Sequence, residues 1–131
     1  MNSIKIIVPV TVKAKLTEKL RARLVDEATR VAEQMELELK QINIDMQREL
    51  EKNPEHAAQI RNFFGSEMAP RQGRLDEAHR RKETFEKLAL GAEIVQGTTE
   101  RLVELKVGDN FRDAMNVEIL VEDDKIIAIR G

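Results

Sequence analysis

The sequence contains no cysteine, tryptophan or tyrosine, and only four phenylalanines and three prolines among its 131 residues. Without cysteine there are no disulfides, no thiolate chemistry and no cysteine-ligated zinc or iron–sulfur site. A core with so few aromatic rings has to be built from Leu, Ile, Val, Met and Ala, a composition typical of long amphipathic helices. The length suits one domain, or one small module that carries an extension.

Long hydrophobic runs and an excess of basic charge are also missing. No apolar run reaches the ~18 residues that a transmembrane helix requires, and the β-like first residues do not resemble a signal peptide. The 22 Lys and Arg against 24 Asp and Glu give a net charge of −2, whereas a dedicated nucleic-acid-binding protein normally carries a basic excess. We therefore expect a cytoplasmic protein that makes no membrane contact.

Residues 1–15 alternate as a β-strand does. One side of this predicted strand carries Ile4, Ile6, Val8, Val10 and Val12, at the period of two expected for a half-buried strand. Pro9 has no N–H to donate, so we expect either an edge strand or a strand that is broken at this point.

From Thr17 to about Lys52 the pattern changes to that of a long helix with Thr17 as a plausible N-cap. The apolar positions are Leu20, Leu24, Ala28, Val31, Met35, Leu39, Ile42, Met46 and Leu50. They repeat every eleven residues, or ~3.67 residues per turn, which predicts a seam that runs straight or drifts slightly right-handed. At ~1.5 Å rise per residue the helix is a rod of roughly 54 Å.

A second helix of matching length is predicted over residues 54–90. Pro54 is acceptable at a first helical position, and Gly91 is a natural C-cap. Because Gly65, Pro70 and Gly73 fall within nine residues, we expect a kink or a short unwound stretch near residues 65–73. The two arms, 16–90 in all, then form a long antiparallel, coiled-coil-like hairpin.

Residues 91–131 return to β-like composition. We expect short strands at 94–95 and 102–107 separated by a turn at Gly97, one helical turn at 111–115, and a hairpin of 117–121 with 125–129. Neither end of the chain is long enough to bury a core alone. The predicted fold is therefore α+β: residues 1–15 and 91–131 make one small antiparallel β-sheet or barrel module, and the helical hairpin is inserted into it.

The junctions of these segments resemble those of the bacterial YlqD family. The resemblance rests on Val12-Lys13-Ala14-Lys15-Leu16-Thr17-Glu18, Leu90-Gly91-Ala92-Glu93-Ile94, Leu105-Lys106-Val107-Gly108-Asp109 before Phe111, and Ile126-Ile127-Ala128-Ile129-Arg130. It spans the whole chain in order. It implies a strand, paired helices and a small β unit; the family has no established activity, so the resemblance assigns no catalytic residue.

The residues themselves do not form a recognisable catalytic or metal-binding set. Neither Ser3 nor Ser66 lies in a Gly-x-Ser-x-Gly turn. His56 and His79 are separated by roughly 35 Å of predicted helix, too far to share a metal ion. The carboxylates lie mostly on polar helix faces, and a two-helix rod offers no cleft for acid–base chemistry. We expect no enzyme activity, no metal and no cofactor.

Two surface features suggest binding. Leu37 and Ile44 lie almost opposite the apolar seam of the first helix, and pairing the arms sets Phe63 level with Ile44. These three residues are the predicted contact with a second copy, a homo-oligomer and most simply a dimer, or with another partner. The alternative is that they are scattered surface residues.

The second feature is a basic cluster on the second helix, formed by Arg71, Arg74, Arg80, Arg81 and Lys82. It would suit ribosomal or other RNA phosphates, although no aromatic residues are interleaved and nearby acids offset part of its charge. The predicted function is thus a non-enzymatic interaction or scaffold protein that self-associates through its helices. The alternatives are a ribosome- or RNA-associated accessory factor and a chaperone-like clamp.

Overall fold

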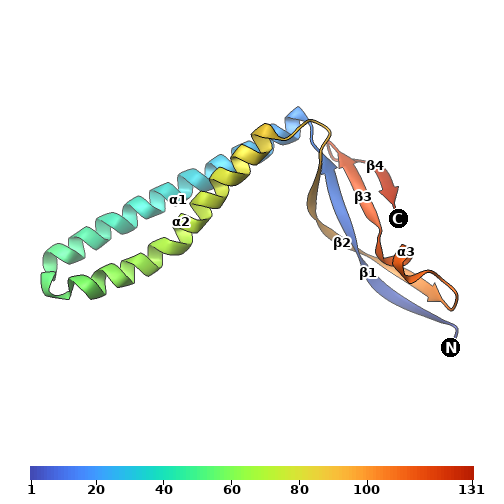
Figure 1. Ribbon diagram of the computed structural model, residues 1–131, viewed down its shortest axis with the longest axis horizontal. Coiled ribbons are helices and arrows are strands. Elements are labelled where there is room, and N and C mark those ends of the chain that lie inside the picture. Colours follow the sequence, from blue (N-terminus) through green and yellow to red (C-terminus); the bar gives the residue numbers. More distant parts are fainter. The chain divides into compact units, whose positions relative to one another are not determined.

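The computed structural model describes residues 1–131. Its elements in chain order are β1 (Ser3–Lys15), α1 (Glu18–Lys52), a 3-10 turn η1 (Pro54–His56), α2 (Ala57–Lys87), β2 (Glu93–Lys106), α3 (Phe111–Met115), β3 (Glu118–Glu122) and β4 (Lys125–Arg130) (Figure 1). The expected α+β fold is confirmed: two long helices interrupt a sheet that is built from both ends of the chain.

The chain divides into two compact units. The sheet unit comprises Met1–Arg21 and Leu88–Gly131, and the hairpin unit comprises Ala22–Lys87. α1 therefore begins in the sheet unit and has most of its length in the hairpin unit, whereas α2 lies wholly in the hairpin unit. None of the helices has the combination of length and apolar composition that a membrane span requires.

The sheet has the strand order β2-β1-β3-β4 and is mixed. β1 pairs antiparallel with β2, and β3 pairs antiparallel with β4, but β1 and β3 are parallel through Thr11–Ala14 against Glu118–Val121. The expectation of a wholly antiparallel sheet was therefore wrong for this one pair. Parallel neighbours need a long crossover connection, and here the whole helical hairpin together with β2 supplies it.

β2 is a single strand of 14 residues, so the turn expected at Gly97 does not exist. β1 is long enough to pair with β2 from Ser3↔Lys106 to Lys15↔Glu93, and this ladder outweighs the weak strand preference of Gly97, while the two threonines that follow it favour a strand. The local irregularity is a bulge: Val12 pairs with Gly97 while Lys13 pairs with Val95, which leaves Gln96 as the extra residue.

The alternation of β1 predicts its buried side correctly. Val8 and Val10 are 1% and 3% exposed, while Pro9 between them is exposed. Since β3 pairs with β1 only from Thr11 onward, β1 has β2 as its sole neighbouring strand at Pro9. The missing N–H is thus placed at a free edge, and the strand continues unbroken.

The residues just before α1 and just after α2 are joined by hydrogen bonds within the sheet unit. The N–H of Leu16 donates to the carbonyl of Ala92, and the N–H of Gly91 donates to the carbonyl of Leu16, both at 2.8 Å. Leu16 itself is 2% exposed. The guanidinium of Arg21 on α1 donates to the carbonyl of Leu88, just beyond the end of α2, where a helix leaves its last carbonyls unpaired.

The predicted cap of α1 is present. The Thr17 hydroxyl oxygen accepts a hydrogen bond from the N–H of Leu20 at 3.1 Å, as an N-cap does. The same hydroxyl donates to Asp123 at 2.8 Å. Asp123 and Asp124 both have positive φ, 46° and 68°, which is the conformation of a two-residue type I′ turn between β3 and β4.

The apolar seam of α1 differs from the predicted one at a single step. Ala32 is buried and Val31 is exposed, although the eleven-residue repeat placed Val31 on the seam. A step of four after Ala28, instead of three, brings the small Ala32 side chain into the contact with α2, where Leu75 and Ala78 lie. A methyl group fits between closely approaching helices where a branched side chain would hold them apart.

α2 runs without interruption from Ala57 to Lys87, with Pro70 inside it. Of the two alternatives predicted near residues 65–73, a kink or a short unwound stretch, the unwound stretch is therefore wrong. In Figure 1 the helix instead changes direction in its middle, where the ribbon passes from green to yellow. A bend is the usual response to a proline ring that clashes with the preceding turn and removes one hydrogen bond.

Two glycines provide a test of this backbone. Gly91 has φ +88°, whereas Gly65 lies inside α2, where a Cβ atom would meet nothing within 4 Å. We expect Gly91→Ala to lower the free energy of unfolding by about 1 kcal/mol and Gly65→Ala to raise it by about 0.5–1 kcal/mol. Urea unfolding followed by circular dichroism at 222 nm measures both, since the chain has no Trp or Tyr. Equal effects of the two substitutions would contradict the left-handed conformation at residue 91.

Candidate binding groove of the helical hairpin

The hairpin unit has a thin core. The helices pack through a cluster of Ala32 and Met35 on α1 with Leu75 and Ala78 on α2, and Leu39 packs against its side. Two of these four residues are alanines, which contribute little apolar area each. Two helices of more than thirty residues each thus bury seven side chains within the hairpin unit, these four together with Leu24, Ala28 and Phe85.

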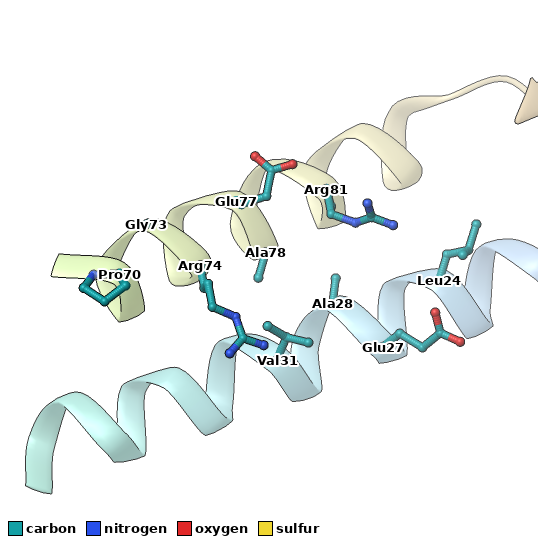
Figure 2. A pocket seen from close by; sticks show the side chains of 10 residues that line it. All are labelled: Leu24, Glu27, Ala28, Val31, Pro70, Gly73, Arg74, Glu77, Ala78 and Arg81. Carbon is teal, nitrogen blue, oxygen red and sulfur yellow. The ribbon is translucent and has the colours of Figure 1, made fainter. Parts of the chain in front are cut away.

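Beside this core the two helices leave a hollow of about 440 Å³ open between them. Its walls are apolar or small residues from both helices together with four charged side chains: Leu24, Glu27, Ala28, Val31, Pro70, Gly73, Arg74, Glu77, Ala78 and Arg81. Figure 2 shows Ala28 and Ala78 facing each other across the gap. The hollow exists because alanine, glycine and the compact proline ring do not fill the space between the helix axes.

The charged residues of the hollow occupy its rims. Arg74 reaches from α2 towards Val31, and Arg81 points towards the part of α1 that carries Leu24 (Figure 2). Glu77 points away from α1 and is bonded to Arg80, with oxygen–nitrogen distances of 2.8 and 3.1 Å. An apolar floor with charged rims is the usual character of a surface that receives a partner or ligand.

A second hollow, of about 360 Å³, lies nearer the tip of the hairpin. It is lined by Glu49 of α1 and by Gln59, Ile60, Phe63 and Phe64 of α2. Phe63 is 61% exposed, and its ring meets that of Phe64 edge-on at 5.2 Å between centroids. Phe63, Pro70 and Glu77 follow one another at steps of seven residues, so the two hollows lie along one side of α2.

The other two predicted contact residues, Leu37 and Ile44, are exposed, Leu37 by 63%. Neither lines either hollow. They lie one above the other on α1 at a spacing of seven, on the side away from its apolar seam. The structure therefore places Phe63 on the grooved side of the hairpin and leaves Leu37 and Ile44 as a separate apolar row.

The basic cluster of α2 is not one continuous patch. Arg71 lies beside α1, where its guanidinium bonds Glu38 at 3.1 Å, and it also contacts Glu67. Arg80 is paired with Glu77. Lys82 is half-buried. Arg74 and Arg81 line the hollow. The five basic residues therefore lie in at least three different environments.

Arg74 and Arg81 have no carboxylate partner at ion-pair distance in the structure. Arg81 lies over the Phe85 ring, 5.4 Å from its centroid, an arrangement in which the ring face attracts the guanidinium. Their seven-residue spacing puts them on the same side of α2 as the two hollows. The sequence predicted both arginines as part of the basic cluster, but it did not single out Glu27, Val31 or Gly73 as binding residues.

The arrangement offers binding and no visible chemistry. The residues that face the groove are aliphatic side chains, guanidinium groups and carboxylates, with no nucleophile beside a base. No three metal-ligating side chains in the chain are grouped closely enough to hold an ion.

The architecture defined by these observations is a long antiparallel helical hairpin inserted into a small four-stranded mixed sheet. A family model matches the chain over residues 4–130, and the chain therefore belongs to the YlqD protein family. No curated protein matches it.

A crystal structure of a protein of unknown function from Synechococcus sp. WH 8102 has the same fold. It is 21% identical in sequence, with a TM-score of 0.81, and the match covers 98% of this chain and 95% of that one. At this level of identity the likeness concerns the fold alone. The helical hairpin and the sheet are thus shared by two chains whose sequences have diverged widely.

The ion pair across the hairpin gives a testable pKa. The hydrogen bond from Arg71, followed by one from Gln34, holds the pKa of Glu38 below its ordinary value of 4.5. We expect Arg71→Met to raise this pKa towards the ordinary value, and Arg74→Met, whose charge acts on Glu38 only weakly, to change it much less. Carboxyl carbon chemical shifts followed by NMR over pH 2–7 measure both.

The sign of the linkage follows from the lowered pKa. Glu38 contributes to the free energy of unfolding at pH values above its pKa in the unfolded chain. This contribution is lost as the pH falls through the pKa of Glu38 in the folded chain. An unchanged Glu38 titration in Arg71→Met would show that this pair does not form in solution.

Proposed function

We propose that the chain is a non-enzymatic, cytoplasmic interaction protein that self-associates through the grooved side of its helical hairpin. The observation that carries the proposal is the open hollow between α1 and α2, beside a core cluster of four buried residues of which two are alanines. A long helical pair gains most of its stability from tertiary packing of its apolar face. A second hairpin on the grooved side would supply the packing that the single hairpin lacks.

The exposed apolar residues support this proposal. Val31 and Phe63 both line hollows on the grooved side and both remain exposed in the single chain. Leu37 and Ile44 form the alternative contact row on α1. The grooved side is favoured because it combines concave shape, apolar walls and an aromatic residue, the features that concentrate binding energy at interfaces.

The RNA-binding alternative stays a prediction and has less support. Two of the five basic residues already pair with carboxylates on the same hairpin, Arg71 with Glu38 and Arg80 with Glu77, which reduces the charge available to phosphates. The clamp alternative also stays a prediction. It requires the two helices to separate, and the Arg71–Glu38 pair and the small apolar core oppose that separation.

A pair of matched substitutions on α1 tests the proposed surface. We expect Val31→Lys to raise the dimer dissociation constant about tenfold or more, because it places a positive charge on the groove wall beside Arg74, which points towards residue 31 and has no carboxylate partner. Leu37→Lys places the same charge on the other side of the same helix and is expected to leave the constant unchanged. Lysine is at least as good a helix former as either residue it replaces, so helix propensity does not explain a loss.

Sedimentation equilibrium of the full chain over micromolar concentrations measures this constant, and circular dichroism checks that each variant folds. A wild-type chain that stays monomeric throughout the range contradicts self-association. If Leu37→Lys alone weakens the association, the row of Leu37 and Ile44 is the interface and the grooved side is not.

A further inference from the structure

The two rims of the groove carry opposite charge. On the α2 rim, Arg74 and Arg81 have no carboxylate partner, while the carboxylate of Glu77 is paired with Arg80. On the α1 rim, Glu27 has a single long contact, 3.9 Å to Arg23, and its side chain is 62% exposed. All three line the same hollow (Figure 2). An occupant of the groove therefore has to present a negative charge over α2 and a positive charge over α1.

A second copy can cover this groove with twofold symmetry in two ways. If the twofold axis runs across the helices, each α2 lies over the partner's α2, and Arg74 and Arg81 face the partner's arginines. If the axis runs along the hairpin, each α1 lies over the partner's α2, and Glu27 faces the partner's Arg81. Both contacts are isologous, but the first juxtaposes like charges, which opposes association, and the second juxtaposes opposite charges.

We propose that the occupant of the groove is the grooved side of a second copy, arranged with the twofold axis along the hairpin, so that Glu27 of each chain pairs with Arg81 of the other. The proposal rests on the self-association proposed above and specifies its geometry. Each α1 then lies antiparallel to the partner's α2, and the two hairpins form a four-helix bundle with antiparallel neighbours, a common packing of paired helices. Val31 of each chain faces the partner's α2 and helps to fill the hollow.

The surface is large enough for a stable dimer. Two helices side by side are about 20 Å wide, and the part of the hairpin in which both helices run side by side is about 40 Å long. The area of this side is therefore roughly 800 Å² on each chain. Specific protein interfaces bury about 800 Å² per partner. The opposite charges contribute orientation more than affinity, because exposed ion pairs are individually weak.

Charge exchange between chains tests this geometry. Glu27→Arg alone and Arg81→Glu alone each create two like-charge contacts in the homodimer, and we expect each to raise the dissociation constant about tenfold. A one-to-one mixture of the two variants restores both opposite pairs in the heterodimer, so its dissociation constant returns to near the wild-type value. The double variant Glu27→Arg with Arg81→Glu restores the homodimer for the same reason.

The mixture separates contacts between chains from contacts within one chain. If Glu27 and Arg81 mattered only inside one hairpin, the double variant would recover but the mixture of single variants would not. Glu33→Arg on α1 and Arg61→Glu on α2 make the same changes of charge at exposed residues that line neither hollow, and they serve as controls that leave association unchanged. Circular dichroism of every variant monitors folding.

The outcomes distinguish the two proposals. A mixture that associates no more tightly than either single variant, while the wild type dimerises, overturns the charge-paired geometry and leaves self-association standing. A wild type that remains monomeric overturns self-association and the geometry with it. Tight association of the mixture together with weak association of each single variant supports both.

Discussion

Two backbone hydrogen bonds at Leu16 are the constraint on which the architecture depends. They join the end of β1 to the Gly91–Ala92 segment, so the residues just before α1 and just after α2 meet within the sheet unit. The bond from Arg21 to the carbonyl of Leu88 supports the same point. Because the arms are nearly equal in length, the chain returns to where it left the sheet, and the β1–β2 ladder continues as if the hairpin had not been inserted.

The sheet unit and the hairpin unit are stabilised by different interactions. The sheet unit is held by the long ladder of β1 with β2, by Val8, Val10 and Leu120 in its core, and by charged links such as Lys13–Glu118 at 2.7 Å. The hydrogen bond from Arg130 joins edge strand β4 to Glu93 on the other edge strand and lowers the pKa of Glu93. The hairpin unit instead buries seven side chains, three of them alanines, and has ion pairs between its helices such as Arg71–Glu38.

The balance between apolar packing and charge also explains why this hairpin is unlike a regular coiled coil. At positions where a coiled coil would place apolar knobs, α2 carries Arg71, which bonds Glu38 across the helix pair, and Lys82. The small residues Ala28, Gly73 and Ala78 line the hollow and leave the space between the helices unfilled there.

The sequence by itself determined the types of element and their approximate bounds: the alternation of β1, the Thr17 cap, the two long helices and the acidic β3–β4 turn are all local patterns, set by residues close together along the chain. The tertiary structure decided that β2 is continuous, that β1 and β3 are parallel, that Ala32 rather than Val31 faces α2, and that Glu27, Val31 and Arg81 line one hollow. These features depend on which distant segments pair and on how closely two helices approach. A periodic pattern predicts which side of a helix is buried with an error of about one residue, as at Val31 and Ala32. The register and the distance between two helices depend on the side chains that meet across the contact.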